Sequence, residues 1–261
     1  MDNFKRTTTK QTTAKEIGDN MHEYILTADI AKKRDFFALM LFHDNAQLVD
    51  GNKTLETPDR VLHFYDIKKI EQYQGLGYEE MAGRIATIMQ NPKLRLNTDL
   101  IVDGTGVGEA AVELIRKQGL YPIPIIFSGG ESAKEHHAEF GGVFKNSGNG
   151  AISGAKVLKD ISIPKKELVD AGKVMIQQGR LRIAPGRWNE DFKKQLSKFK
   201  GKVNENTRHT KYEAETEQDH DDLVVCFLMG AWWIFNRKEK GIPEQTSSQN
   251  ATTGWEPNDY F

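Results

Sequence analysis

Two short apolar runs, at residues 24–31 and 36–43, are separated by only a few polar residues near the start of the chain. Both runs are rich in strand-forming side chains, and two such runs joined by a short polar turn predict a β-hairpin. The apolar residues 61–67 predict a third strand, whereas the polar segment 44–59 predicts a loop. The chain therefore begins its folded part with a β-meander.

After this meander the pattern changes to an alternation of helices and strands. Met81, Ile85 and Ile88 recur at helical spacing, the apolar run 99–104 predicts a buried strand, and residues 108–118 predict a second helix. A meander followed by βαβ units predicts an α/β fold with a mixed central β-sheet flanked by helices. Further predicted elements are a strand at 121–129, helices at 165–178 and 189–199, a short strand within 179–186, and a buried helix at 221–235.

The same patterns divide the chain into three regions. Residues 1–20 lack hydrophobic periodicity and predict a flexible tail, residues 21–236 predict one folded domain, and residues 237–261 predict a disordered tail. Inside the domain, residues 129–156 are rich in glycine and small polar side chains, which predicts a long loop or an extended hairpin. Loops of this length in a compact domain are usually functional or disordered.

The composition excludes several classes of protein. The longest apolar stretch, residues 223–235, is too short to span a bilayer, and residues 1–20 have no apolar core of a secretory signal, so we expect no membrane association. The single cysteine, Cys226, excludes an internal disulfide framework and a cysteine-based metal cluster, and it fits a reducing cytoplasm.

Charge is distributed unevenly along the chain. The formal net charge is −1, yet residues 156–211 hold 15 Lys and Arg against 6 Asp and Glu, so this segment carries +9 and the remainder −10. Such a distribution suits a metal-dependent nuclease, because basic side chains neutralise phosphates and acidic ones hold cations. An ordinary solvated charged surface is the alternative explanation.

Four aspartates stand where local propensity does not favour them. Asp29 lies inside an apolar run and Asp103 ends another, while Asp221 and Asp222 begin the apolar helix. A buried carboxylate is costly unless it is paired or bound to a metal. Asp103 can instead form a turn with Gly104, and Asp221 can cap its helix, but nothing local accounts for Asp29. These four aspartates are the candidate catalytic residues.

The order of these acids resembles the RNase H-like superfamily: one on the first strand of a hairpin, one at the end of a later strand, and one at the start of a late helix. Within that superfamily the chain is similar to the nuclease domain of terminase large subunits of tailed bacteriophages. The resemblance covers roughly residues 22–236 and implies an RNase H-like fold. Its matching stretches are TADIAKKRDFFAL, LIVDGTGVGEAAVELI, PKKELV with QQGRLRIAP, and DHDDLVVCFLMGAW.

The resemblance implies a site for two divalent cations that bridge the scissile phosphate. Asp29 and Asp103 would be metal ligands, and the third ligand would be Asp221 or Asp222, of which Asp221 matches the family's position better. Clustered carboxylates stay ionised only with cations between them, and hard oxygen ligands select Mg²⁺ or Mn²⁺. One cation would activate the attacking water and the other would stabilise the leaving 3′ oxygen. His220 lies beside these acids and would contact phosphate or a ligand, unless its role is structural.

The activity implied by the resemblance is metal-dependent endonucleolytic cleavage of double-stranded DNA with little sequence specificity, as in viral genome packaging. The implied partners are double-stranded DNA, a terminase ATPase domain, a small terminase subunit and a portal, in the cytoplasm of the host cell. The loop at 128–154 would form a hairpin that contacts the duplex. Candidate phosphate contacts, which position DNA without reading its sequence, are Lys145, Lys156, Lys193, Lys194 and Lys198. Exposed lysines that only keep a helix soluble are the alternative explanation.

Other interpretations of the sequence stay open. No phosphate-loop motif G-x-x-x-x-G-K-[ST] occurs, so the chain would be a nuclease portion of a longer protein or an independent relative, and not a packaging motor by itself. A Holliday-junction resolvase-like nuclease and a catalytically silent RNase H-like module that binds DNA or a partner are the competing functions. The glycines of DGTGVG do not have dinucleotide-binding spacing, and we expect them to clear space for metal and DNA at the strand end.

Overall fold

The computed structural model of the chain describes residues 23–30, 36–49, 60–106, 108–130, 132–139, 156–203, 210–214 and 220–238. Among these residues, eight strands form one sheet in the order β6-β7-β5-β4-β1-β2-β3-β8, and two more form a separate ribbon. The strands of the sheet are β1 (Tyr24–Asp29), β2 (Phe36–Val49), β3 (Arg60–Gln74), β4 (Thr98–Asp103), β5 (Ile123–Ser128), β6 (Lys134–Glu139), β7 (Lys156–Pro164) and β8 (Leu181–Ile183). The strands of the ribbon are β9 (Phe199–Val203) and β10 (Thr210–Ala214).

The sheet is mixed. β1 pairs in parallel with β4, β4 with β5, and β5 with β7, whereas β2 is antiparallel to β1 and β3, and β6 is antiparallel to β7. The four parallel strands therefore bring their carboxyl ends to one edge of the sheet. This topology confirms the predicted α/β fold with a mixed central sheet.

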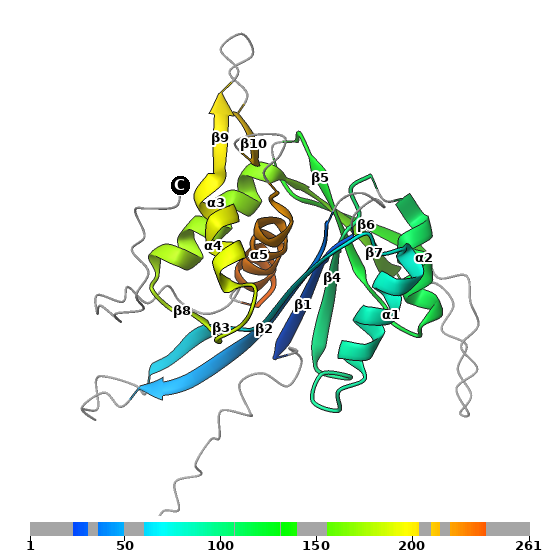
Figure 1. Cartoon of the computed structure of the whole chain (residues 1–261), viewed down its shortest axis with the longest axis horizontal. Coiled ribbons are helices and arrows are strands. Elements are labelled where there is room, and N and C mark those ends of the chain that lie inside the picture. The colour runs from blue at the N-terminus through cyan, green and yellow to red at the C-terminus, as the bar shows by residue number, and fades with distance from the viewer. Residues whose placement is uncertain are drawn as a thin grey trace, which may run out of the picture.

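Helices cover both faces of the sheet (Figure 1). On one face lie α1 (Tyr78–Met89) and α2 (Gly108–Lys117); on the other lie α3 (Lys165–Gln177), α4 (Asn189–Lys198) and α5 (Asp222–Trp233), which continues as a π-helical segment, η2 (Ile234–Lys238). Side chains alternate between the faces along each strand, so β1 sends Leu26 and Ala28 into the core under α1 and α2, and Ile25 into the core under α5.

α5 is the buried helix that the sequence predicts at 221–235. All its residues after Asp222 are buried, because the helix is apolar on nearly every side and has neighbours on nearly every side. It lies against the sheet at Gly230, where an added Cβ would be only 2.3 Å from the ring of Phe42. It lies against α3 at Gly172, where an added Cβ would be 2.4 Å from Leu228. Two glycines thus allow this helix to pack closely on both neighbours.

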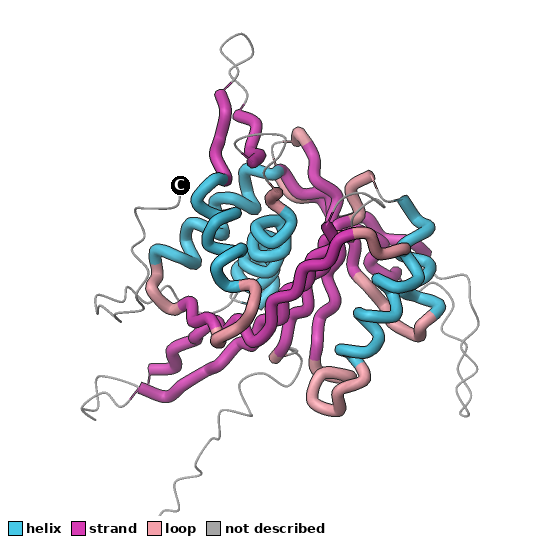
Figure 2. Tube along the Cα trace, viewed as in Figure 1, coloured by secondary structure: helices cyan, strands magenta, loops and turns pink. Residues whose placement is uncertain are grey.

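The first meander is longer than the sequence predicts. β2 continues to Val49, so the loop predicted at 44–59 is wrong for residues 44–49. Residues 44–49 remain in a strand because they pair with β3; for example, Nδ1 of His63 lies 2.8 Å from Oδ1 of Asp44. Figure 2 shows β2 and β3 as a long twisted pair that extends beyond the neighbouring strands.

Several strands have no counterpart in the sequence analysis. β7, β9 and β10 were not predicted, because apolar side chains are few in β9 and β10 and are interrupted by Lys159 and Asp160 in β7. β6 lies inside the segment predicted as a loop or an extended hairpin, and its antiparallel pairing with β7 agrees with the hairpin alternative. Residues 140–155, between these two strands, lie outside the described residues.

The two predicted tails also lie outside the described residues, except for residues 237–238 at the end of η2. In the part of the chain that the structure describes, no helix combines the length and the apolar character that a membrane crossing requires.

Candidate active site

Asp29 and Asp103 end neighbouring parallel strands. The register of β1 and β4 pairs Ala28 with Val102, so the next residue of each strand is an aspartate at the carboxyl edge of the sheet. Both aspartates point to the face that α5 covers, because Ile25 and Ile101, four and two residues before them on the same side of their strands, belong to the core under α5. The topology thus brings together two acids that are far apart in the sequence.

Asp221 and Asp222 reach the same edge from the start of α5. Asp222 is the first residue of the helix and Asp221 precedes it. The pKa of Asp29 lies well above its ordinary value, mainly because of burial, and further because of the negative charges of Asp103, Asp222 and Asp221. All four predicted carboxylates therefore lie close enough for their charges to act on Asp29.

Asp103 is fixed by the turn that follows β4. Its side chain is 9% exposed, and burial raises its pKa from 3.8 to about 6. The N–H of Thr105 donates to Oδ1 of Asp103 at 2.7 Å, which opposes that rise. Thr105 is held in turn, because its Oγ1 accepts a hydrogen bond of 2.8 Å from the N–H of Phe127 on β5.

The glycines after Asp103 shape this turn. The N–H of Gly104 donates to the carbonyl of Ile125 at 2.8 Å, and a Cβ on Gly104 would lie 3.0 Å from Pro124. Gly106 has a φ of +74°, a conformation that favours glycine. Close packing of the turn against β5 therefore requires glycine here, in addition to the predicted need for space at the strand end.

Lys165 is a cation at the acidic edge that the sequence analysis did not single out. It begins α3 directly after β7, and its Nζ lies 3.8 Å from Oδ2 of Asp221. The ammonium also lies 6.0 Å from the ring centroid of Phe127 and 5.5 Å from that of Phe199. Lys165 lies in the matching stretch PKKELV, but its place beside Asp221 depends on the unpredicted strand β7.

Two buried glutamines support Asp222, Gln72 directly and Gln195 through Gln72, and neither was predicted. Nε2 of Gln72 donates to Oδ2 of Asp222 at 3.2 Å, and Nε2 of Gln195 donates to Oε1 of Gln72 at 3.1 Å. Oε1 of Gln195 accepts the N–H of Leu223 at 2.9 Å. The strand register places Gln72 in the same row as Asp29, two strands away. β3, α4 and α5 thus converge on one carboxylate.

His220 lies at the exposed side of this site. Its Nδ1 is 4.0 Å from Oδ2 of Asp222, and its ring packs edge-on against Phe36, with 4.4 Å between the ring centroids. The imidazole is exposed. The contact with Phe36 therefore gives the ring a structural role, while its exposure keeps it accessible to a ligand.

The lysines predicted to contact phosphate lie in different environments. On α4, Lys193 pairs with Glu190 at 2.9 Å, Lys194 is exposed, and Lys198 is partly buried. Lys156 begins β7, and Lys145 lies outside the described residues.

The four aspartates offer only hard oxygen donors, which suit Mg²⁺ or Mn²⁺. Within the described part of the chain, no three His, Cys, Asp or Glu side chains converge closely enough to form a complete ligand set. The chemistry of the donors nevertheless fits a divalent cation. Burial raises the pKa of Asp29 and of Asp103, carboxylate repulsion adds to both, and a cation between them would relieve these effects.

Comparison with known proteins identifies the family of the chain. A family model described as the terminase RNaseH-like domain matches residues 26–226, a range that includes all four aspartates. Among solved structures, the chain is similar to the large terminase nuclease from thermophilic phage G20c, with a TM-score of 0.47 and 15% sequence identity, over 79% of this chain and 80% of that one. No curated protein sequence matches this chain.

Proposed function

Because the chain belongs to the family of terminase RNaseH-like domains, we propose that it is a divalent-metal-dependent endonuclease that cleaves double-stranded DNA with little sequence specificity. Carboxylates gathered in a partly buried site are costly unless they hold cations. The observation that carries the proposal is one such gathering at the carboxyl edge of the sheet, made by Asp29, Asp103, Asp221 and Asp222.

In this proposal Asp29 and Asp103 hold the cations together with a carboxylate from the start of α5. When bound, Mg²⁺ or Mn²⁺ would neutralise these carboxylates and draw electron density away from the scissile phosphate. Lys165 would donate a charge-assisted hydrogen bond to a phosphate oxygen at the same edge. Gln72 would keep the carboxylate of Asp222 oriented.

The third ligand is the point on which sequence and contacts differ. The sequence favours Asp221, whereas the side chain of Asp222 is less exposed, at 14% against 31%, and is held by Gln72. We therefore propose Asp222 as the ligand, with Asp221 as the partner that positions Lys165. Asp222→Asn should abolish plasmid cleavage, whereas Asp221→Asn should leave a measurable rate; the opposite ranking would restore Asp221 as the ligand.

The family also supports a setting for this activity. We propose that the chain works in viral genome packaging, in the cytoplasm of the host cell, beside an ATPase domain, a small terminase subunit and a portal. The absence of a phosphate-loop motif from the sequence fits a division of labour in which ATP hydrolysis belongs to another domain or chain.

The test is cleavage of supercoiled plasmid in the presence of Mn²⁺, Mg²⁺ or EDTA. We expect nicking and linearisation that depend on the metal and that disappear in Asp29→Asn and Asp103→Asn. Asp99→Asn is the matched control, because Asp99 lies on the same strand and face as Asp103, at the other end, where it accepts a 2.8 Å hydrogen bond from Trp233.

Two results would contradict the proposal. If the wild-type protein binds DNA but cleaves it no better than the variants do, the chain is a catalytically silent binding module. Cleavage confined to branched DNA by a dimer would identify a resolvase-like nuclease.

A further inference from the structure

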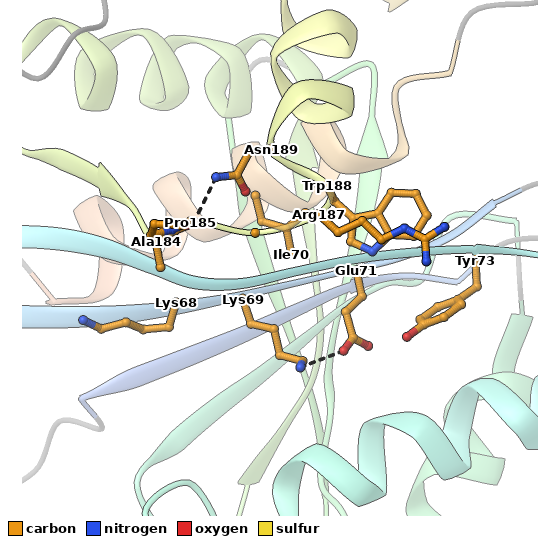
Figure 3. Close-up of a pocket in the computed structure, with 11 residues that line it drawn as sticks. Lys68, Lys69, Ile70, Glu71, Tyr73, Ala184, Pro185, Arg187, Trp188 and Asn189 are labelled. Atoms are coloured by element: carbon orange, nitrogen blue, oxygen red, sulfur yellow. Dashed lines mark hydrogen bonds and ion pairs between the residues drawn. The ribbon is translucent and has the colours of Figure 1, made fainter.

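A pocket lies outside the carboxylate site, along the open edge of β3 (Figure 3). β8 pairs only with residues 65–67 of β3, so among the described strands nothing continues the sheet beside residues 68–74. The segment between β8 and α4, residues 184–188, faces this edge instead. The cavity between them has a volume of about 370 Å³, which lies in the range of small-ligand sites.

Cations surround the pocket. Nζ of Lys68 donates to the buried Asp66 at 2.8 Å, and Nζ of Lys69 lies 2.9 Å from the buried Glu71, so both ammonium groups are held at the pocket. Arg84, which does not line the pocket, also neutralises Glu71, and its Nε donates to the carboxylate at 2.8 Å. The lining therefore carries more positive than negative charge, and its one carboxylate is already bonded to two cations.

Arg187 is the cation best placed to bind a ligand. It is exposed, and its guanidinium lies 4.6 Å from the ring centroid of Trp188. Trp188 is supported by an edge contact with Tyr73, with 6.5 Å between the centroids. Figure 3 shows these three side chains gathered at one end of the pocket. No carboxylate in the described part of the chain is paired with Arg187, and Glu71, the carboxylate of the lining, is bonded to Lys69 and Arg84 instead.

α4 connects this pocket to the carboxylates. The helix begins at Asn189, which lines the pocket, and ends before Phe199, against which Lys165 packs beside Asp221. The first turn of the helix carries the exposed acids Glu190 and Asp191, and Lys194 is exposed after them. α4 thus runs from the pocket toward the candidate active site.

We propose that this pocket binds a backbone phosphate of the DNA substrate, outside the carboxylate site, with Arg187 as the principal contact. A guanidinium suits phosphate because its donors match two oxygens at once, and stacking on Trp188 keeps it oriented before DNA arrives. The contact positions the strand without reading its sequence. The inference rests on DNA being the substrate of the proposed nuclease.

The test measures binding of a fluorescein-labelled duplex by fluorescence anisotropy in EDTA, where cleavage does not occur. Arg187→Ala should weaken binding about five- to tenfold and lower the slope of log K against log salt concentration by about one, as expected for the loss of one phosphate contact. Arg187→Lys should keep the slope and bind less tightly than wild type, because it retains the charge without the planar fork.

Arg95→Ala is the matched control, since Arg95 is equally exposed but lies before β4, at the opposite end of the sheet from the carboxylates. It should bind duplex as wild type does. If Arg187→Ala and Arg95→Ala bind alike, the pocket does not contact DNA. In a competition assay, dAMP and unlabelled duplex are each added to displace the labelled duplex. If dAMP displaces it from wild type as effectively as unlabelled duplex does, but does not do so in Arg187→Ala, the occupant of the pocket is a free nucleotide and the DNA assignment fails.

The plasmid assay separates this inference from the proposed nuclease. Cleavage by wild type with unchanged binding in Arg187→Ala would reject the pocket alone. Weakened binding in Arg187→Ala by a chain that does not cleave would reject the nuclease alone.

Discussion

At the scale of single residues, the side chain that donates to Asp222 from β3 is a neutral amide, that of Gln72. A lysine or arginine in the place of Gln72 would pair with the carboxylate and compete with a cation for it. An amide instead orients Oδ2 without bringing a positive charge of its own. Residues that hydrogen-bond to a metal ligand usually influence the affinity for the metal as well as the orientation of the ligand.

Gln72→Ala should therefore raise the Mg²⁺ concentration that gives half-maximal cleavage by about tenfold. The rate at saturating Mg²⁺ should change less, because the ligands themselves remain. Gln74→Ala is the control, since Gln74 is exposed on the same strand. Equal Mg²⁺ dependence of the two variants would show that Gln72 serves packing only.

The raised pKa of Asp103 has a consequence for stability in the absence of metal. A carboxyl whose pKa in the folded state is about 6, against 3.8 ordinarily, binds its proton more tightly when folded. Its contribution to stability is therefore present at low pH and is lost as the pH rises from about 4 through about 6. The raised pKa of Asp29 acts in the same direction.

We expect the metal-free protein to be more stable at about pH 5 than at about pH 7.5. Asp103→Asn, which cannot ionise, should stabilise it at the higher pH by at most about 3 kcal/mol and flatten the pH dependence. Urea unfolding in EDTA at the two pH values measures both effects. Asp170→Asn, at an exposed carboxylate of α3, is the control and should leave the pH dependence of stability as in wild type. If Asp103→Asn also leaves it unchanged, burial of Asp103 does not make stability depend on pH.

At the scale of elements, β3 contributes side chains to both the carboxylate site and the pocket. Because side chains alternate along a strand, Gln72 points to the carboxylates under α5, while Glu71 and Tyr73 point away from α5 and border the pocket. The proposed cleavage site and the proposed phosphate site are therefore fixed relative to each other by one strand.

Close packing of α5 depends on glycine. Gly230→Ala places a Cβ 2.3 Å from the ring of Phe42, so we expect a loss of about 1–3 kcal/mol in the free energy of unfolding. Gly83→Ala in α1 is the opposite case, because nothing lies within 4 Å of its added Cβ. It should stabilise the protein by about 0.5–1 kcal/mol. Chemical unfolding of both variants checks the pair, and equal effects would contradict the packing argument.

At the scale of the whole molecule, the carboxylates sit where the sheet and the first turn of α5 meet. A cation bound there would link β1, β4 and α5, and binding to the folded state alone raises its stability. Mn²⁺ should therefore raise the midpoint temperature of thermal unfolding. The free energy of unfolding should rise by about 2.7 kcal/mol when the metal concentration is a hundredfold above its Kd. The shift should vanish in the double variant Asp29→Asn with Asp103→Asn and persist in Asp99→Asn. A shift of equal size in all three proteins would place the cation elsewhere.

Much of the site was predictable because its acids violate local rules. Asp29 inside an apolar run and Asp103 at the end of another are visible without a structure, since burial of an unpaired carboxylate is costly wherever it occurs. The supporting residues were not predictable. Gln72 lies in an ordinary polar stretch, and its role arises from contacts with residues more than a hundred positions away.

The sequence by itself determined the α/β class, the helices at α1 to α5 and the candidate acids, because apolar periodicity and misplaced charge are local properties. The tertiary structure decided how far β2 runs, that β7 pairs with β5, and that Lys165 lies beside Asp221. It also decided that an open edge of β3 faces Arg187 across a pocket. These features depend on pairing between distant segments, and in each case the stabilising partner, a strand ladder or an opposite charge, is supplied by another part of the chain.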